Sequence, residues 1–175
     1  MTMQLIKTKL YDLKKAAGTV WLAWLWVVLW MGLIFFFSSQ PGKESAELSQ
    51  GISQILINLV TRVSPDLNVD WQAFHLLIRK NAHFFVYLIL GILVLRALLK
   101  TKPFSIRTGI TALLICFIYA VTDEFHQLFV PGRSGQVSDV IIDTFGAAAG
   151  LALYSAFLHL KQRRAKRRQD HRQFN

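Results

Sequence analysis

The stretch that decides the fold is residues 20–37, which read VWLAWLWVVLWMGLIFFF. These eighteen residues carry no charge, and a helix of this length is long enough to cross a hydrocarbon core of roughly 30 Å. No small-x-small cleavage pattern follows, so we expect a retained helix rather than a signal peptide. Three more apolar stretches follow, at 84–99 with Arg96 near one end, at 109–121, and at 140–160 interrupted by Asp143.

The composition agrees with a membrane protein. The chain is 53% hydrophobic over 175 residues, with thirteen Phe and five Trp, which is too apolar for an ordinary soluble domain of this size. We therefore predict an all-α polytopic membrane protein with four transmembrane helices and an outer amphipathic helix. A soluble helical bundle with buried core helices is the alternative. The lone Cys116 lies inside the third stretch, so no intramolecular disulfide can form.

The charge distribution predicts which way the chain faces. With a cytoplasmic N-terminus and four crossings, fifteen of the twenty Lys and Arg lie on the inner side, and eight of the ten Asp and Glu lie on the outer side. Lys and Arg near helix ends favour the cytoplasm. We therefore expect a multi-pass cell-membrane protein with both termini cytoplasmic. The basic tail is interpreted as a topology determinant against anionic lipid, and no nucleic acid is expected as a partner.

The expected organisation has three parts: a cytoplasmic segment at 1–19, a four-helix membrane domain at 20–160 and a basic cytoplasmic tail at 161–175. Within the membrane domain, apolar residues recur at helical spacing over about 44–63, opposite a polar face. This pattern predicts an amphipathic helix on the outer leaflet or capping the bundle. Asp70 is a candidate N-cap for a helix that enters at Trp71 and continues into the second span.

Polar residues gather in two blocks on the outer side, RKNAHFFVY at 79–87 and TDEFHQLFVPGR at 122–133, with two aspartates after them. Residues three or four apart share a helix face, which predicts three such faces: Arg79, His83 and Tyr87; Tyr119, Asp123 and Gln127; and Asp139, Asp143, Gly146 and Gly150. The small residues 146–150 let a neighbouring helix approach closely. We expect the three faces to converge at the outer membrane boundary.

The residue types in this cluster suit chemistry on an anionic substrate. Ionisable groups at a hydrocarbon boundary are costly, so they persist mainly where they pair or work. Carboxylates and imidazoles suit general acid–base catalysis, and arginines suit phosphate or carboxylate groups. The candidate catalytic residues are Asp123, His83, His126, Glu124 and Asp143. The candidate substrate-binding residues are Arg79, Lys80, Tyr87, Gln127, Arg133 and Asp139.

Structural roles are the alternatives for the same residues. Arg79 and Lys80 would serve as headgroup anchors, and either histidine as an interhelical hydrogen bonder. Asp143 would pair with Arg79 or Arg133, and Glu124 would be solvated at a helix end. The tryptophans of the first span are expected to face lipid or pack rather than bind a ligand: Trp21, Trp24, Trp26 and Trp30.

The sequence offers one possible set of metal ligands. Asp123 and His126, three residues apart, would supply mixed oxygen and nitrogen ligands together with His83. No tight ligand motif such as H-E-x-x-H is present, so the sequence assigns no metal site, and it identifies no cofactor. No serine stands in a nucleophile elbow, which disfavours covalent catalysis by serine.

The chain resembles the VanZ-like family of small bacterial membrane proteins, one member of which is linked to teicoplanin resistance. The resemblance covers about residues 31–160. It rests on Ser38-Ser39-Gln40-Pro41, on Arg79-Lys80-x-x-His83-Phe84-x-x-Tyr87 with Gly91, on Thr122-Asp123-Glu124-x-His126-Gln127-x-Phe129-x-Pro131-Gly132-Arg133, and on Gly135, Asp139, Asp143 and Gly146. At Asp143 the chain departs from the family pattern, in which Asn is frequent. The resemblance implies a polytopic envelope protein with an influence on glycopeptide susceptibility, and it implies no particular reaction.

Three functional hypotheses follow. In the leading one, an outward polar pocket binds or modifies a membrane lipid, either a lipid-linked cell-wall precursor or another anionic envelope lipid. If the protein is an enzyme, Asp123 is the expected base, assisted by His83 or His126, with Arg79 and Arg133 on the anionic group. The second hypothesis is a non-enzymatic adaptor or lipid-binding module. The third, a small transporter, is disfavoured because Arg96 is the one ionisable residue expected near the inner end of the spans.

Overall fold

The computed structural model describes residues 2–44 and 71–173, together with positions 47, 50, 51, 54, 55, 58 and 62. All regular secondary structure in these residues is helical, and its main elements are α1 (Thr2–Ser38), α3 (Trp71–Leu98), α4 (Ile106–Gln127) and α5 (Val137–Gln173). Each contains a segment long and apolar enough to cross a membrane: Ala17–Ser38, Leu76–Leu98, Ile106–Gln127 and Val137–Arg167. The predicted all-α fold with four membrane-spanning helices is thus confirmed. The amphipathic helix predicted over 44–63 lies largely outside the described residues.

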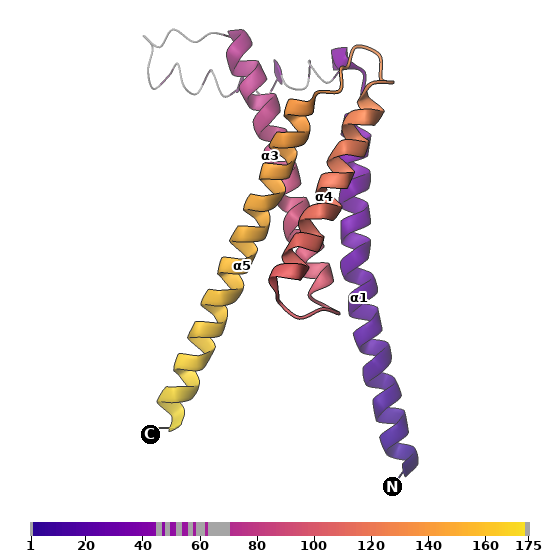
Figure 1. The fold of residues 1–175 in the computed structure, drawn as a ribbon, viewed down its shortest axis with the longest axis vertical. Helices are drawn as coiled ribbons and strands as arrows, with labels where there is room; N and C mark the ends of the chain where they lie inside the picture. Colours follow the sequence, from indigo (N-terminus) through magenta and orange to yellow (C-terminus); the bar gives the residue numbers. More distant parts are fainter. Residues whose placement is uncertain are drawn as a thin grey trace.

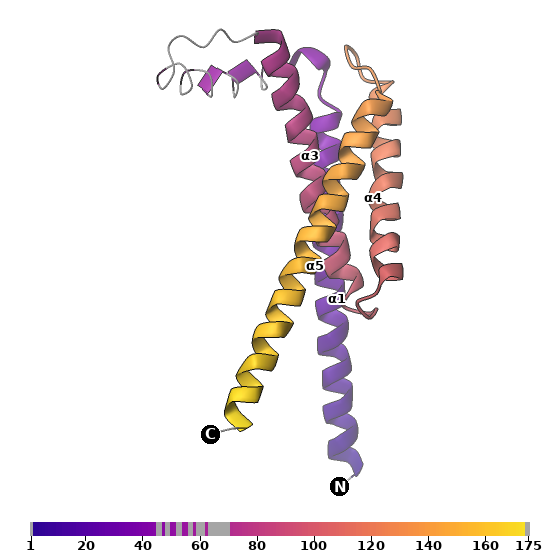
Figure 2. The same ribbon diagram turned by 60° about the vertical axis from the view of Figure 1, so that its left-hand side comes forward.

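Helix α3 contacts each of the other three helices, and its contact with α5 is the most extensive in the bundle. Figures 1 and 2 show α3 and α5 crossing, with α1 and α4 completing the bundle. The two chain termini lie at one end (Figure 1). The end of α1 and the loop from α4 to α5 lie at the opposite end, which we call the polar end because residues 122–133 and the start of α5 are there.

The helix boundaries follow local sequence. Helix α3 begins at Trp71 and runs unbroken, as predicted, although Asp70 lies outside the described residues. Helix α4 reaches spanning length by including 106–108 and the polar residues up to Gln127. At its start, the Ser105 hydroxyl accepts a hydrogen bond from the Thr108 amide at 3.2 Å, which is an N-cap. Helices α1 and α5 also include most of the two predicted cytoplasmic segments.

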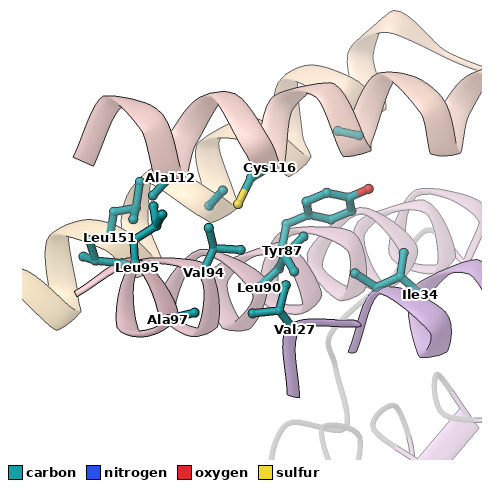
Figure 3. Close-up of a cluster of buried hydrophobic side chains, with 13 residues drawn as sticks. Val27, Ile34, Tyr87, Leu90, Val94, Leu95, Ala97, Ala112, Cys116 and Leu151 are labelled. Atoms are coloured by element: carbon teal, nitrogen blue, oxygen red, sulfur yellow. The ribbon is translucent and has the colours of Figure 1, made fainter. Parts of the chain in front are cut away.

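The buried core is a narrow apolar seam along α3. Figure 3 shows side chains of α1, α4 and α5 meeting this seam; it includes Val27, Ile34, Tyr87, Leu90, Val94, Leu95, Ala112, Cys116 and Leu151. Many larger apolar side chains point outward instead, among them Trp21, Trp26 and Phe145. Helices with apolar residues on both the inner and outer faces are expected where the surroundings are lipid.

Glycines on α5 allow its backbone to touch that of α3. A Cβ atom placed on Gly146 would lie 2.2 Å from the carbonyl oxygen of Phe84, and one on Gly150 would lie 2.1 Å from that of Leu88. Such distances are shorter than any real contact, so only glycine fits at either position. The predicted close approach at 146–150 is confirmed, and it brings His83 to the level of Asp143.

Candidate functional site

The centre of the site is a close contact between a histidine of α3 and an aspartate of α5. The Nδ1 atom of His83 lies 3.3 Å from Oδ1 of Asp143; the Asp143 side chain is fully buried, and that of His83 is 18% exposed. Asp143 was expected, as one alternative, to pair with Arg79 or Arg133. In the part of the chain that the structure describes, its ion-pair partner is the histidine.

Glu124 joins α4 to the start of α5. Its Oε2 atom accepts a hydrogen bond from the backbone N–H of Gln136 at 2.8 Å, and Gln136 directly precedes the first residue of α5. A helix N-terminus favours a carboxylate because its first N–H groups lack partners within the helix. The alternative that Glu124 is solvated at a helix end is wrong, because its side chain is buried.

Three ligand-type side chains meet at this point. One donor atom each from His83, Glu124 and Asp143 lie within 4.8 Å of one another, and all three residues are at least partly buried. The sequence had offered Asp123 and His126 with His83 instead. Successive helical residues point about 100° apart. Glu124 therefore faces the start of α5, whereas Asp123 faces the cavity described below. The ring of His126 packs on α1 instead, where its centroid lies 4.5 Å from the centroid of the Phe35 ring.

A cavity of about 440 Å³ opens beside this cluster, between α1, α3, α4 and the loop that follows α4. Its wall is mainly apolar, with two arginines, one histidine and one carboxylate among the polar lining groups. The lining residues are Trp30, Leu33, Ile34, Phe37, Ser38, Gln40, Arg79, Ala82, His83, Val86, Tyr87, Asp123 and Arg133. His83 is therefore shared between the cavity and the three-residue cluster.

Arg133 is held in the cavity wall by the backbone of α1 and the residues after it. Its Nε atom donates to the carbonyl of Gln40 at 3.1 Å, and its Nη2 atom donates to the carbonyl of Phe37 at 2.9 Å. Burial, and then the positive charge of Arg79, lower the pKa of the Arg133 guanidinium from its usual value. Two arginines close enough to repel each other would be stabilised by an anion between them.

Some of the other predicted site residues line the cavity and others do not. Tyr87 is buried and lines the cavity together with Arg79 and His83, so the face predicted on α3 is confirmed. Asp139 is buried in the first turn of α5. Lys80, Gln127 and Asp139 are not among the described residues that line the cavity.

Helix α1 contributes more to the site than the sequence predicted. The buried Ser38 hydroxyl accepts a hydrogen bond from Nε2 of Gln127 at 3.0 Å. Trp30 lines the cavity and donates from Nε1 to the carbonyl of Val86 at 2.9 Å. The sequence held one signal that the end of α1 belongs to the site. This signal was the string Ser38-Ser39-Gln40-Pro41, which carried part of the family resemblance. Hydrophobicity alone gave no sign that Trp30 differs from the exposed Trp21.

Comparison with known proteins identifies one family. Neither the curated proteins nor the solved structures gave a match. A family model for VanZ/LLP1 matches residues 23–159, which is most of the chain and includes every residue of the cavity and of the three-residue cluster. The chain therefore belongs to the VanZ/LLP1 family of proteins.

Proposed function

We propose that the cavity binds the anionic headgroup of an envelope lipid, with a lipid-linked cell-wall precursor as the leading substrate class. The observation that carries the proposal is the pairing of Arg79 and Arg133 beside an otherwise apolar wall. Arginine binds phosphate and carboxylate groups in bidentate geometry, and the apolar wall suits the hydrocarbon chain next to such a group. A volume of about 440 Å³ accommodates a headgroup and the first part of a chain.

The apolar wall continues onto the membrane-facing surface. Leu33 and Phe37 line the cavity, and both are large exposed apolar side chains on the surface of α1. A ligand with its headgroup at the arginines would therefore keep its hydrocarbon portion in contact with apolar side chains and lipid. This arrangement favours a lipid over a free, water-soluble anion.

The cavity is proposed to face the outside of the cell. Both termini lie at the opposite end of the bundle (Figure 1), and Lys and Arg are concentrated towards that end. In spheroplasts, a membrane-impermeant maleimide should label a Ser134→Cys variant and spare a Gln162→Cys variant until the membrane is permeabilised. Both positions are exposed and the native Cys116 is buried. The reverse labelling pattern would place the cavity in the cytoplasm.

The lipid proposal predicts a large loss of binding when both arginines are neutralised. Purified full-length protein should retain a long-chain polyprenyl phosphate in native mass spectrometry, and retain phosphatidylcholine much less. In the Arg79→Gln/Arg133→Gln variant, affinity should fall about tenfold or more for each arginine, because a hydrogen bond to a charged group contributes roughly 1.5–3 kcal/mol. Phosphatidylglycerol, titrated separately, distinguishes a general anionic lipid from a polyprenyl phosphate.

Matched controls separate the cavity from charge in general. Lys80→Gln removes the neighbouring charge outside the described lining, and Arg96→Gln removes an exposed charge near the other end of α3. Both controls should bind like the wild type. Equal binding by the double arginine variant would contradict the proposal and favour the adaptor hypothesis.

Expression of the wild type, but not of the double variant, should alter teicoplanin susceptibility if the ligand is a cell-wall precursor.

A catalytic version of the proposal centres on Asp123. This buried carboxylate lines the cavity together with His83 and Ser38. A carboxylate in that setting suits a general base. His126 is not among the described lining residues, so His83 is the better-placed assistant of the two histidines.

A further inference from the structure

We propose that His83, Glu124 and Asp143 form a binding site for one divalent metal ion of the zinc and manganese class. The three side chains come from α3, α4 and α5, and they meet at the polar end of the bundle. This site goes beyond the proposed lipid function and does not depend on it. Metal binding can be measured on protein that carries no lipid.

The geometry of the cluster matches the ligand shell of a small cation. Zinc lies about 2.0–2.2 Å from imidazole nitrogen and carboxylate oxygen, so two tetrahedral ligand atoms lie roughly 3.3 Å apart. The separation of His83 Nδ1 from Asp143 Oδ1 is 3.3 Å. The donor atom of Glu124 lies within 4.8 Å of the other two donor atoms, so the three groups can surround one ion once Glu124 moves closer to it.

The carboxylates also have unused ligand capacity. Both oxygens of Asp143 and the Oε1 atom of Glu124 are buried without a hydrogen-bond partner among the described residues. Asp143 is fully buried and Glu124 is 4% exposed, so bulk solvent is largely excluded from both carboxylates. Among the described residues, Asp143 has the contact with His83 and Glu124 has one backbone hydrogen bond, so each buried carboxylate is only partly compensated, which costs several kcal/mol for buried ions. A dication coordinated by those oxygens would offset this cost.

The donor set selects the class of ion. One imidazole with two carboxylates suits zinc, manganese or ferrous iron, whereas magnesium and calcium prefer oxygen ligands throughout. Three protein ligands leave a position on a tetrahedral ion for water or for a ligand oxygen. Because His83 also lines the cavity, the ion would lie beside the space where an anionic headgroup is proposed to bind.

Direct metal analysis tests the site. Full-length protein without a polyhistidine tag is stripped with a chelator in detergent and delipidated, then incubated with Zn²⁺ or Mn²⁺ and desalted. Elemental mass spectrometry should find about one ion per chain in the wild type. Glu124→Gln and Asp143→Asn should each lower the apparent affinity at least 10-fold to 100-fold, the range seen when only a supporting partner of a metal ligand is lost.

Three matched variants serve as controls. His126→Gln, Asp123→Asn and Asp139→Asn change the same residue types close by, outside the three-residue cluster, and should keep the ion. Zn²⁺ should raise the melting temperature of the wild type and of these controls, and should leave that of Asp143→Asn unchanged. Ca²⁺ should raise none of them.

Two outcomes would overturn the metal site. One is a monodisperse, metal-free wild type at saturating Zn²⁺ and Mn²⁺. The other is equal metal content in the wild type and in Glu124→Gln/Asp143→Asn. Neither result bears on the arginine-dependent lipid binding when the lipid assay is repeated with chelator present, so failure of one proposal is distinguishable from failure of the other.

Discussion

Replacing Gly150 by Leu should abolish the close packing of α3 against α5. The first atom of the new side chain would lie 2.1 Å from the carbonyl oxygen of Leu88, and that oxygen belongs to a helix backbone that cannot rotate away. The two helices would have to separate. We expect a loss of about 3 kcal/mol or more in stability, at the upper end of the range for overpacked cores. Thermal unfolding in detergent, followed by circular dichroism, measures the loss.

The chain offers a matched control for this substitution. Gly32 lies in α1 with nothing within 4 Å of the position of a Cβ atom, so Gly32→Leu adds the same atoms to open space. That variant should unfold at or slightly above the wild-type temperature, since leucine favours a helix over glycine by somewhat less than ~1 kcal/mol. If both variants lose stability equally, the backbone contact between α3 and α5 is not the cause.

His83→Leu should destabilise the protein by about 3–5 kcal/mol when measured in chelator. The substitution leaves Asp143, which is fully buried, without the partner that lies 3.3 Å away in the folded protein. Removing one member of a buried pair costs more than removing both, because the remaining charge has lost its compensation. The double variant His83→Leu/Asp143→Leu should therefore recover much of the loss.

A double-mutant cycle measures this coupling. Unfolding free energies of the wild type, His83→Leu, Asp143→Leu and the double variant give the interaction energy, which should be at least about 1 kcal/mol. His126→Leu is the control, because His126 packs on Phe35 and has no ion-pair partner among the described residues. Additive effects in the cycle would show that the close approach of His83 and Asp143 contributes nothing to stability.

The faces of the helices were predictable from sequence because helical periodicity is fixed. Arg79, His83 and Tyr87 share the cavity wall as their spacing requires. Gly146 and Gly150 lie against α3 for the same reason. The first span was readable from uncharged length alone, since a bilayer sets a minimum number of apolar residues. The third stretch is apolar over only 109–121, and it reaches spanning length in α4 by adding residues at both ends.

Pairing between helices was not predictable in the same way. Periodicity assigns residues to faces without saying which neighbour a face meets. It therefore gave no means of knowing that Glu124 would turn to α5 and bind the amide of Gln136, or that His126 would turn to α1. The part played by α1 was hidden because backbone carbonyls, which carry no sequence signature, accept the bonds of Arg133 and Trp30.

Arg133 donates from its side chain, and both of its acceptors belong to the backbone. The carbonyls of Phe37 and Gln40 hold the guanidinium, and every amino acid supplies such a carbonyl. Positions 37 and 40 can therefore change identity without loosening α1 from the loop, whereas position 133 cannot. This leaves the exposed ring of Phe37 free to adapt to the surrounding lipid while its own backbone keeps the arginine in place. The side chain at position 37 can therefore vary while the backbone of the same residue continues to hold Arg133.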